Sequence, residues 1–161
     1  MKITKLPNGG ELYEYPNGDK HWYLNGKRHR EDGPAIEQAN GDKEWYIHAI
    51  RHREDGPAVE FTNGDKWWFL NGKRHREDGP AIEFSNGTKI WFINGKRHRK
   101  GGPAAEYSDR KVWYIHGNRH REDGPAVEYD YGRKEWWLNG QPISCTTQKQ
   151  FEQLMRLKVF W

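Results

Sequence analysis

The chain has 161 residues, enough for one domain with its own core, and 14% of them are aromatic, which excludes an intrinsically disordered protein. The formal net charge of +4 lacks the concentrated basic excess of a dedicated DNA-binding domain. The N-terminus has no apolar signal-peptide segment, no run is long enough to span a bilayer, and Cys145 is the only cysteine. We therefore expect a cytoplasmic protein without disulfides.

One seven-residue block recurs along the chain. It reads His-Arg-Glu-Asp-Gly-Pro-Ala from His29, His52, His75 and His120, with a variant from His98, so the histidines lie 23, 23, 23 and 22 residues apart. Six tryptophans recur with the block: Trp22, Trp45, Trp68, Trp91, Trp113 and Trp136. A fixed period of this length indicates stacked supersecondary units that bury their apolar faces against one another. Residues common to all copies should be structural, and partner contacts should lie where the copies differ.

These repeats predict a single all-β domain over residues 1–161. Residues 1–11 are an N-terminal lead-in, residues 12–143 are six β-hairpin units of about 23 residues, and residues 144–161 are a C-terminal helical cap. The predicted fold is an elongated β-hairpin solenoid, closed at its C-terminal end by a short α-helix that covers the last sheet edge.

The unit that begins at Ala58 illustrates the predicted hairpins. Residues 58–62 alternate apolar and polar side chains, and Asn63-Gly64 predicts a two-residue type I′ turn into a return strand over residues 65–70. Asn71-Gly72 predicts a second turn of the same kind. Pairing across the first turn places Val59 opposite Trp68, so the predicted core face carries Val59, Phe61, Trp68 and Leu70.

The C-terminal segment predicts an amphipathic helix. Thr147-Gln148-Lys149-Gln150 has the pattern of a capping box. Phe151, Leu154, Met155 and Lys158 follow at helical spacing, and Val159-Phe160-Trp161 ends the chain as further apolar cover.

The repeated segments resemble a known family. Trp22-Tyr23-Leu24-Asn25-Gly26-Lys27-Arg28-His29, followed by Asn40-Gly41-Asp42 and Trp45-Tyr46, is similar to the MORN repeat, and the resemblance covers about residues 12–140. The His-Arg-Glu-Asp-Gly-Pro-Ala form resembles a variant in proteins of bacteriophages and large DNA viruses. Arg-Glu-Asp-Gly-Pro stands where the usual repeat has a second Gly-x-Gly. The resemblance implies a β-hairpin solenoid and an interaction role without catalysis.

The histidine of each block could suggest metal binding, but the spacing argues against it. Each unit adds two strands, so equivalent histidines lie about 9–10 Å apart. Two imidazoles cannot share a zinc ion bonded at about 2.0–2.1 Å across that distance. We expect no metal and no cofactor, and we interpret each histidine as packed on a tryptophan and hydrogen-bonded to a neighbouring loop.

Two arginine columns leave two interpretations open. They comprise Arg28, Arg51, Arg74, Arg97 and Arg119, and Arg30, Arg53, Arg76, Arg99 and Arg121. They could form a phosphate track, or they could be neutralised by neighbouring acids and stacked on aromatic rings, the interpretation we favour. In the fourth unit both acids of the block are replaced, so we expect an uncompensated basic site there, formed by Lys96, Arg97, Arg99 and Lys100.

The residue before each repeated tryptophan varies, and on the predicted pairing it points away from the core. Trp67, Ile90 and Val112, with Phe69 and Phe92 beside them, are therefore a candidate apolar partner-binding patch, the alternative being that a second layer covers them. Two turn tips also vary. His48 and His116 stand where the other copies have asparagine, which makes them further candidate contacts.

The sequence shows no nucleophile–base constellation and no Gly-rich phosphate loop, so we expect a binding protein rather than an enzyme. Our first hypothesis is that it binds a host protein. The resemblance alone implies a phage or viral origin and inhibition of a defence or regulatory component. A second hypothesis is an anionic ligand, nucleic acid or a nucleotide, held by the arginine columns. A third is a lipid-headgroup or scaffold role, as proposed for MORN proteins. The oligomeric state stays open.

Overall fold

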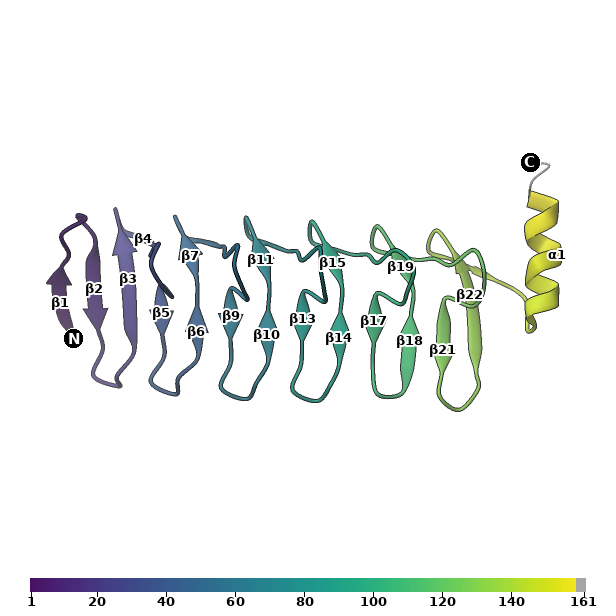
Figure 1. Cartoon of the computed structure of the whole chain (residues 1–161), viewed down its shortest axis with the longest axis horizontal. Coiled ribbons are helices and arrows are strands. Elements are labelled where there is room, and N and C mark those ends of the chain that lie inside the picture. The colour runs from purple at the N-terminus through teal and green to yellow at the C-terminus, as the bar shows by residue number, and fades with distance from the viewer. Residues whose placement is uncertain (159–161) are drawn as a thin grey trace. The chain divides into compact units, whose positions relative to one another are not determined.

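The computed structural model describes residues 1–158, and their regular secondary structure is short β-strands with a single C-terminal helix (Figure 1). Contacts within the chain divide it into two compact units, Met1–Ser85 and Asn86–Trp161. In each unit, short antiparallel strands joined by hairpins recur, which confirms the predicted all-β hairpin repeat. The prediction that the whole chain acts as one domain stays a prediction. Within the described residues, no helix has the length and apolar character needed to cross a membrane.

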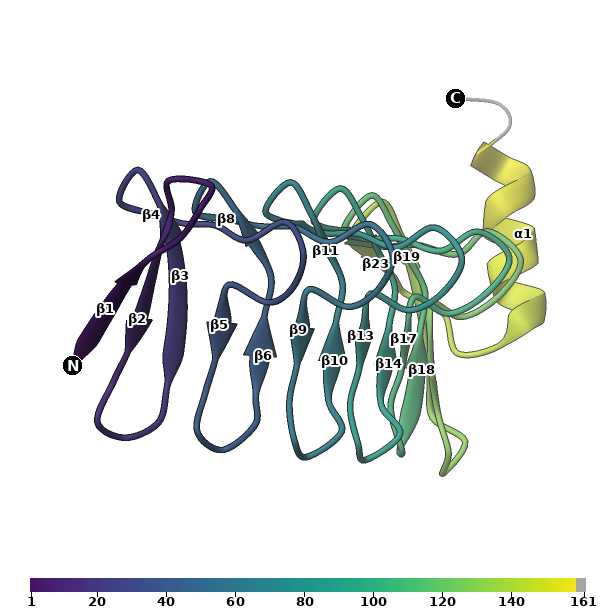
Figure 2. The same ribbon diagram turned by 60° about the vertical axis from the view of Figure 1, so that its left-hand side comes forward.

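The first unit contains an antiparallel sheet in which each new strand pairs with the strand added before it (Figure 2). The order is β1 (Lys2–Lys5), β2 (Glu11–Glu14), β3 (Lys20–Leu24), β5 (Ile36–Glu37), β6 (Lys43–Glu44), β9 (Val59–Glu60), β10 (Lys66–Trp67) and β13 (Ile82–Glu83). A short strand β4 (Lys27–Arg28) pairs with β3, and two small hairpins stand apart, β7 (Tyr46–Ile47) with β8 (Ile50–Arg51) and β11 (Phe69–Leu70) with β12 (Lys73–Arg74). Strand β1 lies within the segment that we predicted only as a lead-in.

The second unit repeats this arrangement. Its sheet runs in the order β14 (Lys89–Ile90), β17 (Ala105–Glu106), β18 (Arg110–Val112), β21 (Val127–Tyr129), β22 (Lys134–Leu138) and β23 (Gln141–Ile143). Its small hairpins are β15 (Phe92–Ile93) with β16 (Lys96–Arg97) and β19 (Tyr114–Ile115) with β20 (Asn118–Arg119).

The two turns of a repeat differ in conformation. At Asn71-Gly72 both residues have positive φ, 50° and 75°, and Leu70 pairs with Lys73, as a type I′ turn requires. At residues 63–64 only the glycine has positive φ, 94°. There the Phe61 N–H donates to the Asp65 carbonyl oxygen at 3.0 Å, which closes a three-residue loop. The second predicted turn is confirmed, and the type I′ prediction for the first is wrong.

The longer first turn shifts the strand register by one residue. Trp67, not Trp68, lies opposite Val59. Successive side chains of a strand point to opposite faces. The shift therefore exchanges the core and outer faces that were predicted for the return strand over residues 65–70. Trp68 and Leu70, predicted for the core, are only half-buried. The prediction that the repeated tryptophans form the core is wrong for Trp68 for this reason.

The core of this repeat consists of smaller residues. Ala58, Val59 and Phe69 are 0%, 1% and 8% exposed, with Phe61 and Trp67 packed against them. Burying a side chain such as valine or phenylalanine stabilises the fold by about 1.5–3 kcal/mol. The alanine that ends each block is fully buried in every copy: Ala35, Ala58, Ala81, Ala104 and Ala126. A larger residue at these positions would overpack the core, which explains why the block ends in alanine.

The C-terminal helix α1 (Gln148–Lys158) is confirmed with its capping box. The Gln150 N–H donates to Thr147 Oγ1 at 3.3 Å, and the Thr147 N–H donates to Gln150 Oε1 at 3.3 Å. Phe151 is 1% exposed and packs with Trp136 and Leu138. The helix thus covers apolar side chains at the end of the second unit, and its predicted cover of the last sheet edge stays a prediction. The predicted apolar cover from residues 159–161 lies outside the described residues.

Candidate functional site

The loop after each histidine is built around one arginine. The Arg53 guanidinium lies 4.1 Å from the centroid of the Trp45 ring. Its Nε donates to Asp55 at 2.8 Å, and its Nη1 donates to the Pro57 carbonyl oxygen at 3.2 Å and to Glu60 at 2.9 Å. The same contacts recur at Arg30, Arg76 and Arg121. The prediction that these arginines are neutralised locally and stacked on an aromatic ring is confirmed.

The arginine also accounts for the glycine and aspartate of the block. A Cβ atom at Gly56 would lie 3.0 Å from Arg53 Cζ, so a larger residue would displace the guanidinium from its place in the loop. The hydrogen bond from Arg53 lowers the pKa of Asp55, and Arg76 lowers the pKa of Asp78 in the same way. Both carboxylates therefore stay ionised over the ordinary pH range.

The histidines of four blocks, His29, His52, His98 and His120, hold the tip of the next hairpin. The Asn71 N–H donates to His52 Nδ1 at 3.2 Å, and the His48 N–H donates to His29 Nδ1 at 3.2 Å. The same bond joins His116 to His98 and Asn139 to His120. These bonds confirm the predicted hydrogen bond to a neighbouring loop, and they require an unprotonated Nδ1 atom.

A second set of bonds between repeats was not predicted. Asp42 accepts the Thr62 N–H at 2.8 Å, and Asp65 accepts the Ser85 N–H at 2.7 Å. These backbone hydrogen bonds lower the pKa of both carboxyls, and Asp19 is held in the same way. The recurring Asn-Gly-Asp triplet is the sequence signal that marks them.

The positive charge of the basic segment in the fourth repeat, residues 96–100, is partly compensated. Arg99 Nη1 lies 2.7 Å from Glu106, so the expectation that Arg99 lacks a counter-charge is wrong. Arg97 donates to the Tyr114 hydroxyl at 3.3 Å and stacks near its ring. Two lysines of the segment, Lys96 and Lys100, are exposed.

The candidate apolar patch is largely buried. Ile90 and Val112 are 6% and 2% exposed, and Phe69 and Phe92 are 8% and 7% exposed. Trp67 is half-buried, with its ring centroid 4.9 Å from that of Phe61. The prediction that these residues point away from the core is wrong: the register shift turns Trp67 inward opposite Val59, and Val112 pairs with the buried Ala105.

The two variable turn tips are exposed, as surface contacts would need to be. The His48 ring lies on the His29 ring with centroids 4.4 Å apart, and the His116 ring lies on the His98 ring at 4.7 Å. Both tips keep the left-handed backbone that the other copies have at asparagine. Their role in partner contact stays a prediction.

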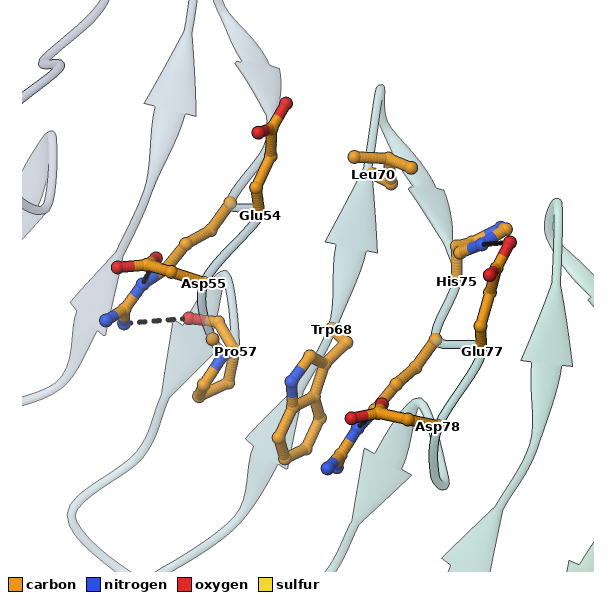
Figure 3. Close-up of a pocket in the computed structure, with 11 residues that line it drawn as sticks. Glu54, Asp55, Pro57, Trp68, Leu70, His75, Glu77 and Asp78 are labelled. Carbon is orange, nitrogen blue, oxygen red and sulfur yellow. Dashed lines mark hydrogen bonds and ion pairs between the residues drawn. The ribbon is translucent and has the colours of Figure 1, made fainter.

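A groove of about 750 Å³ separates two successive loops of the first unit (Figure 3). Trp68 lies between Pro57 of one loop and Asp78 of the next, and Leu70 and His75 lie further along the groove. One face of the Trp68 ring carries the Arg76 guanidinium at 4.1 Å. The half-buried ring gives the groove an aromatic wall, and Leu70 adds an apolar one.

The rim of this groove is acidic. Four carboxylate side chains are 81–85% exposed along it: Glu54, Asp55, Glu77 and Asp78. The two arginine side chains beside them, Arg53 and Arg76, are 22% and 23% exposed. Carboxylates outnumber guanidiniums and project further into solvent, so the groove attracts cations.

The same residue types recur elsewhere in the first unit. A smaller cavity of about 360 Å³ lies beside the first block, lined by Leu6, Pro7, Asn8, Trp22, Tyr23, Leu24, His29, Arg30, Glu31 and Asp32. Between these two cavities, Trp45, Ile47 and His52 stand at the positions equivalent to Trp68, Leu70 and His75. Sequence reasoning missed these grooves because each is formed by two segments that are separated along the chain.

Within residues 1–158, no group of three or more His, Cys, Asp or Glu side chains is placed to hold a metal ion. The sequence matches no protein-family model, and no curated protein shows significant similarity to it. The grooves and the exposed tips are thus the features from which a function can be argued.

Proposed function

We propose that the protein is a non-catalytic binding protein, and that its partner presents lysine or arginine side chains to the grooves of the first unit. One observation supports this most: the groove at Trp68 combines an aromatic wall with four exposed carboxylates. A lysine or arginine side chain has an apolar stem and a cationic end, which suits this combination. Carboxylates also accept charge-assisted hydrogen bonds from both residue types.

The partner is proposed to be a host protein. The resemblance of the block to the form found in phage and viral proteins supports this, and it supports inhibition of a defence or regulatory component as the outcome. Similar sites repeated along a chain raise the affinity for a partner that can occupy several of them together. A protein segment with several basic residues is such a partner.

A second candidate function is binding of an anion, such as a nucleotide or nucleic acid. The observation that favours it is Lys100, an exposed lysine at the position where the other copies of the block have glutamate. Exposed Lys96 adds a second positive charge to the same segment. A phosphate there would bind with a steep dependence on salt. A lipid headgroup or scaffold role would draw on the same chemistry.

The test is a titration with three labelled probes: deca-lysine, deca-glutamate and a single-stranded oligonucleotide. We expect the protein to bind deca-lysine. The double variant Glu54→Gln with Glu77→Gln should bind it about tenfold more weakly, because two rim charges are lost. The matched control removes two exposed carboxylates outside the groove, Asp130→Asn with Glu152→Gln. Circular dichroism checks that both variants fold.

Equal affinity of the two double variants for deca-lysine would overturn the proposal, as would no binding of deca-lysine to the wild type. Tighter binding of deca-glutamate or of the oligonucleotide, lost in Lys100→Glu, would put the anion-binding function in its place.

A further inference from the structure

The candidate sites of the first unit recur at a fixed distance. Each repeat adds two strands to the antiparallel sheet, for example β9 and β10. Neighbouring strands lie about 4.7–4.9 Å apart, so equivalent points of successive repeats lie about 9.4–9.8 Å apart. Three tryptophans of this unit mark the positions, and each carries its own arginine at 4.1 Å: Trp22, Trp45 and Trp68.

This distance selects among the conformations that a bound chain could adopt. A polyproline II helix rises about 3.1 Å per residue with three residues per turn, so every third side chain is on the same side, about 9.3 Å further on. A β-strand covers a similar distance in three residues but places that side chain on the opposite face. An α-helix returns to the same side after seven residues, about 10.5 Å, and it is also much wider.

We infer that the first unit binds an extended segment in the polyproline II conformation, with a lysine or arginine at every third residue. The inference rests on the proposed function, because it specifies the form of the cationic partner that the grooves would hold. Each basic side chain would lie against one tryptophan and beside the exposed glutamate of the block that follows that tryptophan, Glu31, Glu54 or Glu77. The two residues between successive cations face away, and proline at those places favours the required backbone.

The chemistry of each position is repeated closely enough for such a ligand. The arginine beside each tryptophan bonds its own aspartate, the glutamate of the following strand and the proline carbonyl oxygen, so of the rim carboxylates it engages the aspartate and leaves the rim glutamate to a ligand. The rim glutamates are left facing solvent. Glu31, Glu54 and Glu77 have side chains 84%, 81% and 85% exposed.

The set of acidic sites has a defined length. The fourth block carries Lys100 and Gly101 where the earlier blocks carry glutamate and aspartate. Three acidic blocks therefore precede a block without the acidic pair, and a ligand with three properly spaced cations should fill the sites of the first unit.

The experiment compares two labelled peptides of identical composition, length and charge. One is Lys-Pro-Pro-Lys-Pro-Pro-Lys, and the other is its isomer Pro-Pro-Lys-Lys-Lys-Pro-Pro. We expect the wild-type chain to bind the spaced peptide about tenfold or more tightly than the isomer, because only the spaced peptide can occupy three sites at once. This preference should disappear in Glu54→Gln with Glu77→Gln and persist in the control Asp130→Asn with Glu152→Gln.

Equal binding of the two peptides would overturn the spacing rule, and binding of deca-lysine in the same assay would leave the proposed function standing. A preference for the spaced peptide that survives Glu54→Gln with Glu77→Gln would show that the grooves are not its site, which overturns the inference. Failure of both peptides and of deca-lysine to bind would overturn the inference and the proposed function together.

Discussion

The two turns of a repeat contain the same Asn-Gly dipeptide and fold differently. Asn71 has a φ of 50° and forms a two-residue turn with its glycine. Asn63 is not among the residues with positive φ, and its turn has three residues. The difference matters beyond the turn, because the extra residue decides which face of the following strand points to the core.

The two turns also differ in a local hydrogen bond. Asn63 Oδ1 accepts the Asp65 N–H at 2.9 Å, a local bond that stabilises the longer loop. The same bond forms at Asn17, Asn40 and Asn86, whose turns also lead to a residue that is not lysine. At Asn71 the residue after the glycine is Lys73, which instead pairs with Leu70. Asn-Gly-Asp and Asn-Gly-Lys are thus two different turn signals in this chain.

The difference between the two turns is tested most strongly by replacing the asparagine of each turn with a β-branched residue. Asn71→Val places valine at a φ of 50°, where its side chain clashes with the backbone, so we expect a loss of about 2 kcal/mol of unfolding free energy. Asn63→Val keeps an ordinary backbone conformation and loses one exposed hydrogen bond, which costs about 1 kcal/mol or less. Urea denaturation of both variants measures the difference. Equal losses would mean that the first turn also requires a left-handed asparagine.

A smaller effect is the pH dependence of stability that comes from the aspartates bonded to the next repeat at the first turn. The Thr62 N–H lowers the pKa of Asp42, so the unfolded chain binds protons more readily than the folded one. This stabilisation is present above about pH 4 and is lost as the pH falls through the folded pKa. Asp42→Ala should cost about 1 kcal/mol at pH 7. The gap from wild type should narrow below about pH 4 in urea denaturation. A gap that stays constant down to pH 3 would show that Asp42 is not titrating as proposed.

The sequence was sufficient for the repeat and for the helix, because both depend on local signals. The period of the block, the hairpin dipeptides and the capping box at Thr147 and Gln150 each specify a structure within a few residues. The core face was predicted wrongly because it depends on the length of a turn. The extra residue of the first turn placed Trp67, and not Trp68, opposite Val59, and Ile90 and Val112 of the predicted surface patch lie in the core.

The grooves could not be predicted for a different reason. The walls of the groove at Trp68 come from two blocks, those of Pro57 and Asp78, and their separation follows from how the hairpins stack. The exposed carboxylates were visible in the sequence, but there they appeared only as counter-charges for arginine. The structure shows that each arginine points onto its tryptophan, so the glutamates are left at the rim.

The smallest predicted effect concerns the histidine that anchors the second turn in the variant block. Burial, the neighbouring His116 and Lys100 lower the pKa of His98. The unfolded chain then binds the proton more readily, so the contribution of His98 to stability is fully present above about pH 6.5 and is lost as the pH falls through the lower folded value.

In the other described blocks, a glutamate lies 3.4–3.6 Å from histidine Nε2 at the position of Lys100. Lys100→Glu should therefore reduce the loss of unfolding free energy between pH 7.5 and pH 5.5. His98→Asn should remove the part of that loss that comes from His98. Each change should be less than about 1 kcal/mol. Thermal denaturation at the two pH values measures both. An unchanged pH dependence in both variants would mean that the second turn is not released by protonation of His98, and the contrast with the aspartate-anchored turn would then rest on backbone conformation alone.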